Sequence, residues 1–294
     1  MRMSNDNKQG GGRVANNTLE LKNLRLAVLI DAENVPRNSI KSVMEEIAIY
    51  GTPTVKRIYG DWTNPSIAGW KASLLENAIT PVQQYSYTTG KNSSDSAMII
   101  DAMDILYSEK TDGFVIVSSD SDFTRLAIRL REAGQRVIGI GERKTPSPFI
   151  AACDKFTYIE VIRAGGSVNQ GEQVDVQAIQ YGNMHENDVI TYKNTAQPRE
   201  KQTQATRLRA GRVPDTIVNL IADSVSDLAG DDGVVFMGEL GNLILKKQPD
   251  FDHRNFGFKS LSAMIKSVDR FEIDFRQTAD PNIKHVFVRD KEAG

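Results

Sequence analysis

Carboxylate side chains accompany the predicted strands and helices at four places in the first 125 residues. Asp31 comes directly after the apolar run at residues 24–30, and Asp120 and Asp122 follow the apolar run at 114–118. Asp95 begins a predicted helix, and Asp101 lies in the middle of it. Acids without histidine or cysteine nearby favour a hard, oxygen-ligated cation such as Mg²⁺ or Mn²⁺ over zinc. Such a cation can activate water and neutralise a phosphodiester, so the pattern predicts metal-assisted hydrolysis.

Each of these acids also has a structural interpretation. Asp31 alone suits a turn or a helix cap, and Asp120 suits a cap for the helix that begins near Asp122. The helix dipole favours an acid at Asp95. Asp101 lies six positions later, about 240° around the helix, so we expect a supporting or structural role for it. Clustered carboxylates repel one another without a cation, which favours a bound metal for the set as a whole.

The scarcity of histidine and cysteine excludes other chemistry. The three histidines lie after residue 180, and Cys153 is the only cysteine. The N-terminal half therefore has no Ser-His-Asp or Cys-His triad and no paired-histidine cleavage of RNA. A single cysteine excludes an intramolecular disulfide and a cysteine-rich zinc site.

Composition and patterning predict a soluble, cytoplasmic protein without a membrane partner. No apolar run approaches the ~18 residues of a membrane span, and residues 1–17 lack the apolar region of a secretory signal. The net charge is −2 and the pI is near 6.0. Overall charge gives no sign of nucleic-acid binding, although a local basic patch can still provide it.

Alternating strands and helices are expected to position the acids. We predict strands at residues 24–30, 55–59, 82–87, 114–118, 136–140 and 156–162, and helices at 38–50, 68–78, 94–107, 122–133 and 148–155. This alternation predicts a three-layer α/β domain with a parallel sheet. Because ligands collect beyond the carboxyl ends of parallel strands, Asp31 and Asp120 are expected to point into one crevice.

The rest of the chain predicts a tail, a linker and a second domain. Residues 1–23 are expected to be a disordered tail, and residues 164–211, rich in Gly, Gln, Asn and Thr, a flexible linker. Within residues 212–290 we predict helices at 214–228, 238–247 and 260–268, a short extended segment at 234–237, and a hairpin of 271–276 with 284–289. Three helices followed by a hairpin describe a smaller α+β winged-helix domain.

Several motifs in residues 24–163 are shared with a known family: LAVLIDAENV, VKRIYGDW, GKNSSDSAMIIDAMD, FVIVSSDSDF, GQRVIGIG and AACDKF. On these motifs the region resembles the NYN domain of the LabA type, a branch of the PIN-like ribonucleases. The resemblance implies a Rossmann-like sheet and an acidic, divalent-metal site that hydrolyses single-stranded RNA. By motif, it implies that Asp31, Asp95, Asp120 and Asp122 hold the metal, with Asn34 as a polar partner that orients a ligand or water.

Three further residues are secondary candidates. Asp101 matches an acid common in this branch of the family. Ser119 stands where the family often has glycine before the aspartate, and a small residue is retained. Lys91, shortly before Asp95, either holds the scissile phosphate or is an ordinary loop lysine.

The C-terminal region carries the run VVFMGELGNLILKKQPDFDHRNFGFKSLSAMIKSVDRFEID, which resembles the LOTUS domain, also called OST-HTH. The resemblance implies a winged-helix module that binds RNA, in some members structured or G-rich RNA, or else a protein partner. Basic residues cluster around its second and third helices: Lys246, Lys247, Arg254, Lys259 and Lys266. They either contact phosphate or form a solvated helix face, and a homo-oligomer through this domain also stays open.

Together these features predict a metal-dependent endoribonuclease whose catalytic domain is tethered to an RNA-binding winged helix. One alternative is a non-catalytic RNA-binding or silencing adaptor, against which the complete acid set argues. The other is a metal-dependent phosphatase acting on a small phosphoester.

Overall fold

The computed structural model describes residues 24–85, 93–166, 212–230, 232–277 and 284–293. The tail expected at residues 1–23 lies outside the described residues, and so does Lys91. Most of the linker expected at 164–211 lies outside them as well, while residues 164–166 end a helix. Among the helices that the structure describes, none is long and apolar enough to cross a membrane.

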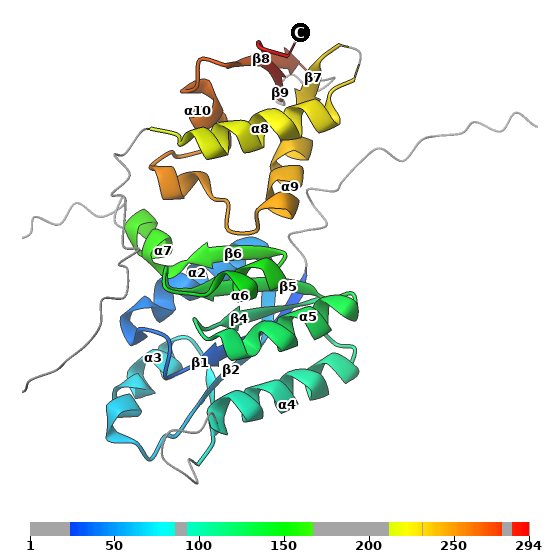
Figure 1. Cartoon of the computed structure of the whole chain (residues 1–294). Helices are drawn as coiled ribbons and strands as arrows, with labels where there is room; N and C mark the ends of the chain where they lie inside the picture. Colours follow the sequence, from blue (N-terminus) through cyan, green and yellow to red (C-terminus); the bar gives the residue numbers. More distant parts are fainter. Residues whose placement is uncertain (1–23, 86–92, 167–211, 231, 278–283, 294) are drawn as a thin grey trace, which may run out of the picture.

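A six-stranded sheet forms the centre of the N-terminal domain (Figure 1). Its strands lie in the order β3–β2–β1–β4–β5–β6, and each neighbouring pair is parallel. Their bounds are β1 Arg25–Asp31, β2 Thr52–Gly60, β3 Thr80–Gln83, β4 Gly113–Val117, β5 Arg136–Gly141 and β6 Lys155–Tyr158. This architecture confirms the predicted Rossmann-like α/β fold.

Helices cover both faces of the sheet, and a hydrophobic core lies under each layer. One core lies under α2 (Ile40–Tyr50), α3 (Lys71–Glu76) and α7 (Ile159–Gly166); the other lies under α4 (Ser93–Tyr107), α5 (Thr124–Glu132) and α6 (Ser147–Ala152). Along β1, Leu26, Val28 and Ile30 face the first core, while Ala27 and Leu29 face the second. Burial on both faces explains why β1 reads as a continuous apolar run.

The predicted strand at 156–162 is wrong in its second half. The strand β6 ends at Tyr158, and α7 begins at Ile159. Ile159 and Ile162, three positions apart, are both buried in the core that α2 covers. Helical spacing places these two side chains on one face, whereas a strand would turn them to opposite sides of the sheet.

Short 3-10 turns begin three of the predicted helices. They are η2 (Arg37–Ser39) before α2, η3 (Pro65–Trp70) before α3, and η4 (Ser121–Phe123) before α5. The turn η4 matters for the site, because it carries the acids that follow β4.

The smaller C-terminal domain combines helices with an antiparallel sheet, in the predicted order of elements. Its helices are α8 (Asp215–Leu228), α9 (Met237–Lys247) and α10 (Leu261–Lys266), with the 3-10 turn η5 (His253–Phe256). Its strands β7 (Val234–Phe236), β8 (Phe271–Gln277) and β9 (Lys284–Asp290) pair in the order β7–β9–β8. A core of its own holds these elements together.

Candidate functional site

Asp31 occupies the carboxyl end of β1, beside the end of β4. It is the last residue of β1 and only 2% exposed. Its carboxylate accepts hydrogen bonds from Ser118 Oγ at 2.9 Å, Asn34 Nδ2 at 2.7 Å and the Glu33 backbone N–H at 3.0 Å. Three donors therefore replace water around this buried acid and fix its orientation. The structure also brings Asn34, a predicted polar partner, directly to Asp31.

Ser118 links the two strand ends, and the sequence analysis missed it. It is fully buried directly after β4. Its hydroxyl donates to Asp31 and accepts from the backbone N–H of Asp120 at 3.0 Å. One side chain thus holds the acid after β1 and the turn after β4 in a fixed relation. A hydroxyl residue that ends a wholly apolar strand just before two acids is the signal that could have found it.

Three carboxylates converge next to this link. Asp95 comes from the first turn of α4, and Asp120 and Asp122 come from the turn η4 after β4. Each offers an oxygen, and these oxygens all lie within 4.8 Å of one another. Asp120 also caps η4, because its Oδ1 accepts from the Asp122 backbone N–H at 2.9 Å. Capping and clustering, weighed as alternatives from the sequence, occur together.

The cluster is buried at one end and open at the other. Asp95 is 7% exposed, whereas Asp122 lies at the surface. Burial and, after it, the nearby charges of Asp31, Asp120 and Asp122 together raise the pKa of Asp95 to about 7. Negative charge from several acids is therefore concentrated at this place. An all-oxygen donor set of this kind fits a hard divalent ion.

The predicted acids do not all lie at the same place. Asp31 is not one of the three whose oxygens lie within 4.8 Å, although its charge acts on Asp95. Asp101 points elsewhere: its carboxylate pairs with the Arg57 guanidinium and accepts from the Tyr59 hydroxyl. Asp101 is therefore not one of the three clustered acids, and the supporting role expected for it stays a prediction.

Ser119 and a neighbouring cavity complete the surroundings of the cluster. Ser119 Oγ accepts from the Glu142 backbone N–H at 2.9 Å, which ties the end of β4 to the segment after β5. A cavity of about 640 Å³ opens beside the end of β1. Ala32, Glu33, Arg37, Asn64 and Trp70 are among its lining residues.

Four of the five basic residues predicted to contact RNA are exposed lysines, and the fifth is Arg254. Lys246 and Lys247 end α9, and Lys259 and Lys266 lie before and at the end of α10, all four with exposed side chains. Lys247 pairs with the exposed Asp227 at 2.6 Å.

Arg254 differs from these lysines, because its guanidinium is bound by the buried carboxylates of Glu46 and Asp252. The sequence prediction grouped Arg254 with the lysines because all five lie around the second and third helices of this domain and the loop between them. The pairing of Arg254 with the distant Glu46 is not visible in the sequence.

Comparisons with solved structures add no functional assignment. A protein of unknown function from Vibrio parahaemolyticus is 19% identical, covers 47% of this chain and 94% of its own, and has a TM-score of 0.41. An uncharacterized protein from Nitrosomonas europaea, solved by NMR in solution, is 26% identical, covers 33% of this chain and 92% of its own, and has a TM-score of 0.25. No curated protein matches the chain.

Family models match two regions of the chain. Residues 25–160 match the NYN domain, and residues 212–283 match the OST-HTH/LOTUS domain. The first of these implies a nuclease acting on RNA, and the second implies RNA binding. The chain therefore contains an NYN domain, the PIN-like nuclease type, at residues 25–160 and an OST-HTH/LOTUS domain at residues 212–283.

Proposed function

We propose that the protein is a metal-dependent endoribonuclease that hydrolyses phosphodiester bonds of single-stranded RNA. One observation carries the proposal: three carboxylates from two separate elements meet within 4.8 Å at the carboxyl ends of the parallel strands. Ligands of open α/β sheets bind at this edge. The NYN match supports reading this acidic edge as a nuclease centre.

We infer different roles for the four carboxylates from their different positions in the site. Asp95, Asp120 and Asp122 would hold the ion, because their oxygens are close enough to share it. Bound there, Mg²⁺ or Mn²⁺ supplies a Lewis acid for water and for the phosphodiester. Asp31 adds a fixed negative charge beside the three, and Asn34 is a positioning residue that holds the Asp31 carboxylate in place.

The rest of the molecule supports RNA as the substrate. After the end of β1, the cavity of about 640 Å³ would offer room for nucleotides, and Arg37 in its lining would supply positive charge for a phosphate. The OST-HTH/LOTUS match and the exposed lysines of that domain support RNA binding at a second place. Binding there raises the local concentration of RNA near the acidic cluster.

Cleavage of a labelled single-stranded RNA tests the proposal. Full-length protein is incubated with Mn²⁺, with and without chelator, beside Asp95→Asn, Asp120→Asn and Asp122→Asn. We expect each substitution to lower cleavage by about 100-fold or more, because it removes a ligand from the site. Asp104→Asn is the matched control, because Asp104 is an exposed acid on the same helix as Asp95.

Three outcomes would contradict the proposal. Equal cleavage by the wild type and all three cluster variants would mean that a contaminant cuts the RNA. Binding of Mn²⁺ and RNA without cleavage would favour the adaptor. Turnover of a small phosphoester with RNA untouched would favour the phosphatase.

A further inference from the structure

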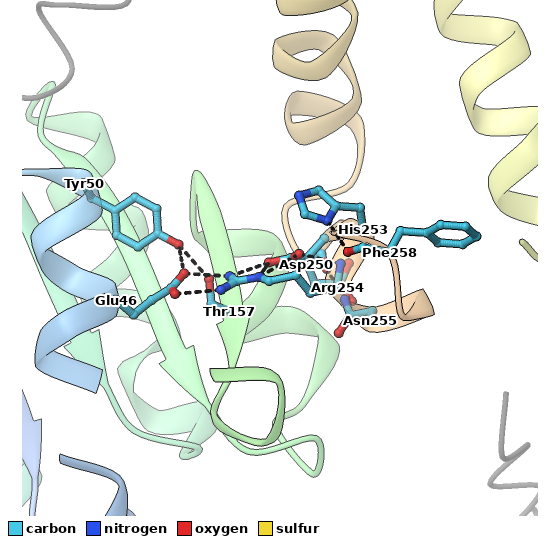
Figure 2. Close-up of polar contacts among 9 residues, drawn as sticks. Glu46, Tyr50, Thr157, Asp250, His253, Arg254, Asn255 and Phe258 are labelled. Atoms are coloured by element: carbon cyan, nitrogen blue, oxygen red, sulfur yellow. Dashed lines mark hydrogen bonds and ion pairs between the residues drawn. The ribbon is translucent and has the colours of Figure 1, made fainter. Parts of the chain in front are cut away.

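One segment of the OST-HTH domain lies against the edge of the NYN sheet (Figures 1 and 2). The backbone N–H of Phe156 in β6 donates to the Pro249 carbonyl at 2.8 Å, and the Tyr158 hydroxyl donates to Asp250 Oδ2 at 2.7 Å. The strand β6 is the last in the sheet, so its outer side would otherwise present unpaired backbone groups. The C-terminal domain thus covers a sheet edge of the N-terminal one.

Arg254 forms the charged centre of this contact, between α2 and the segment before η5 (Figure 2). Its Nη1 and Nη2 donate to the two oxygens of Glu46 at 2.8 and 2.7 Å. Its Nε and Nη2 also donate to Asp252 at 2.7 to 3.1 Å. Glu46 belongs to the NYN domain and Asp252 to the OST-HTH domain, so one guanidinium joins both by paired hydrogen bonds.

Both carboxylates depend on Arg254 for their charge balance. Glu46 is 5% exposed and Asp252 is 7% exposed. Burial, the largest single cause, raises the pKa of each carboxyl. The hydrogen bonds and charge of Arg254, with the charge of Lys155 and, for Glu46, the hydrogen bond from Tyr50, together outweigh burial and lower both pKa values. The Tyr50 hydroxyl also donates to Glu46 and lies 3.2 Å from Thr157 Oγ1 in β6. Without Arg254, the two buried carboxylates would lose the cation that hydrogen-bonds to both of them.

Lys155 is the second cation at the contact. Its ammonium lies 5.6 Å from the centroid of the Tyr50 ring. Burial lowers the pKa of Lys155, while the charges of Asp252 and Glu46 act in the opposite direction. Two acids and two bases therefore meet here, one of each from either domain.

The docking segment is ordered by its own hydrogen bonds. His253 Nδ1 donates to the Phe258 carbonyl at 2.8 Å, and Asn255 Nδ2 donates to the Asp250 carbonyl at 3.2 Å (Figure 2). The Asp252 carboxylate caps η5 by accepting from the Arg254 backbone N–H at 2.8 Å. A segment that is already ordered loses little conformational entropy when it docks.

A cavity lies between the two domains beside this contact, and Glu46 and Arg254 are among the residues that line it. It has a volume of about 530 Å³, and the apolar residues Ile49 on α2 and Met237 and Leu245 on α9 are among those that line it. The apolar sides of α2 and α9 therefore do not close on each other. The polar contacts between the domains described above come from Pro249, Asp250 and Arg254.

We propose that Arg254 is an interdomain clasp, which docks the OST-HTH domain on the α2–β6 edge of the NYN domain by bridging Glu46 and Asp252. Docking uses Arg254 and leaves Lys246, Lys259 and Lys266 exposed to solvent or RNA. The availability of these lysines for RNA rests on the proposed function. The clasp itself rests on the contacts between the domains.

Distance measurements by electron paramagnetic resonance test the clasp in the full chain. Spin labels are placed by Ala72→Cys on α3 and Ser226→Cys on α8, two exposed positions in different domains. The native Cys153 does not compete for label, because it is buried and burial raises its pKa to about 12. We expect one narrow distance distribution for the protein with its clasp intact.

Arg254→Met should lower the ratio of docked to undocked protein by roughly 10- to 100-fold, since it leaves Glu46 and Asp252 unpaired, and the distribution should broaden. Glu46→Gln removes the charge of the NYN-domain partner of Arg254, and it tests the clasp if the Arg254→Met variant does not fold. Arg270→Met is the matched control. Arg270 makes a similar paired contact with Asp290 inside the OST-HTH domain.

A broad distribution of the distance between the two labels in the protein with Glu46 and Arg254 intact would overturn the proposal. So would a narrow one for both clasp variants, or equal broadening by the Arg270→Met control. RNA affinity measured against salt concentration separates docking from RNA contact: Arg254→Met should leave the salt dependence unchanged, and a shallower slope would assign Arg254 to phosphate instead. Absence of RNA cleavage would contradict the proposed function and leave the clasp standing.

Discussion

Asp95→Asn should stabilise the metal-free protein at neutral and alkaline pH. Asp95 is 7% exposed, and burial, together with the neighbouring acids, raises its pKa to about 7 from the ordinary 3.8. Between these two values the folded chain holds a proton on Asp95 that the unfolded chain has released. As the pH rises from about 4 to about 7, Asp95 therefore lowers the free energy of unfolding when no metal is present.

The size of the effect follows from the same interval. Each pH unit between the two pKa values corresponds to about 1.4 kcal/mol, so an interval of about three pH units sets an upper bound of about 4 kcal/mol. Asparagine keeps the shape of the side chain and removes its charge. We expect Asp95→Asn to gain about 1 to 3 kcal/mol over the wild type at pH 8 in chelator, and the gain to shrink toward zero near pH 4.

Urea unfolding followed by tryptophan fluorescence measures this gain. Both tryptophans of the chain, Trp62 and Trp70, lie in the NYN domain, so their fluorescence reports its unfolding. Mn²⁺ at a hundred times its dissociation constant should add about 2.7 kcal/mol to the wild type and less to the variant. The reasoning is refuted if Asp95→Asn is less stable than the wild type at pH 8 in chelator, or if the gain is the same at pH 5 and pH 8.

Three further substitutions probe the surroundings of the site. Asp101→Asn weakens the pairing with Arg57, so the free energy of unfolding should fall by about 1 to 3 kcal/mol. The Mn²⁺ affinity measured by calorimetry should stay unchanged, and a large loss of affinity would make Asp101 a metal ligand. Gly139→Ala places a Cβ 2.5 Å from the Phe156 ring and should cost about 1 to 3 kcal/mol in urea unfolding, and full stability would show that the core can yield. Lys259→Ala should reduce the slope of log affinity against log salt for single-stranded RNA by about 0.7, whereas no change would mean that this lysine contacts no phosphate.

The parts of the fold that the sequence predicts are those with strong local patterns. The strands β1 and β4 are buried on both faces, so each appears in the sequence as an apolar run. The acids at their carboxyl ends can be identified because they directly follow these runs. Helical spacing likewise separates Asp101 from Asp95, and the structure pairs Asp101 with Arg57 and Tyr59. The strands and the position of Asp101 could be predicted because both depend on residues that lie close together in the sequence.

The parts that escaped prediction depend on distant partners. Ser118 is one of several serines in its run, and its role appears only when its hydroxyl meets Asp31, 87 residues away. Arg254 reads as one more basic residue beside the helices, yet its partner Glu46 is 208 residues away. The apolar residues after Tyr158 suit a strand or a helix equally, and packing beside α2 decides for the helix α7.

The most direct measurement is the anomalous scattering of a crystal soaked in Mn²⁺, collected beside the Asp120→Asn variant. We predict a peak about 2.2 Å from carboxylate oxygens of Asp95, Asp120 and Asp122, with the peak lost in the variant. A well-ordered crystal without an ion among these three acids, from protein that still cleaves RNA in Mn²⁺, would contradict the metal site and the nuclease function proposed for it.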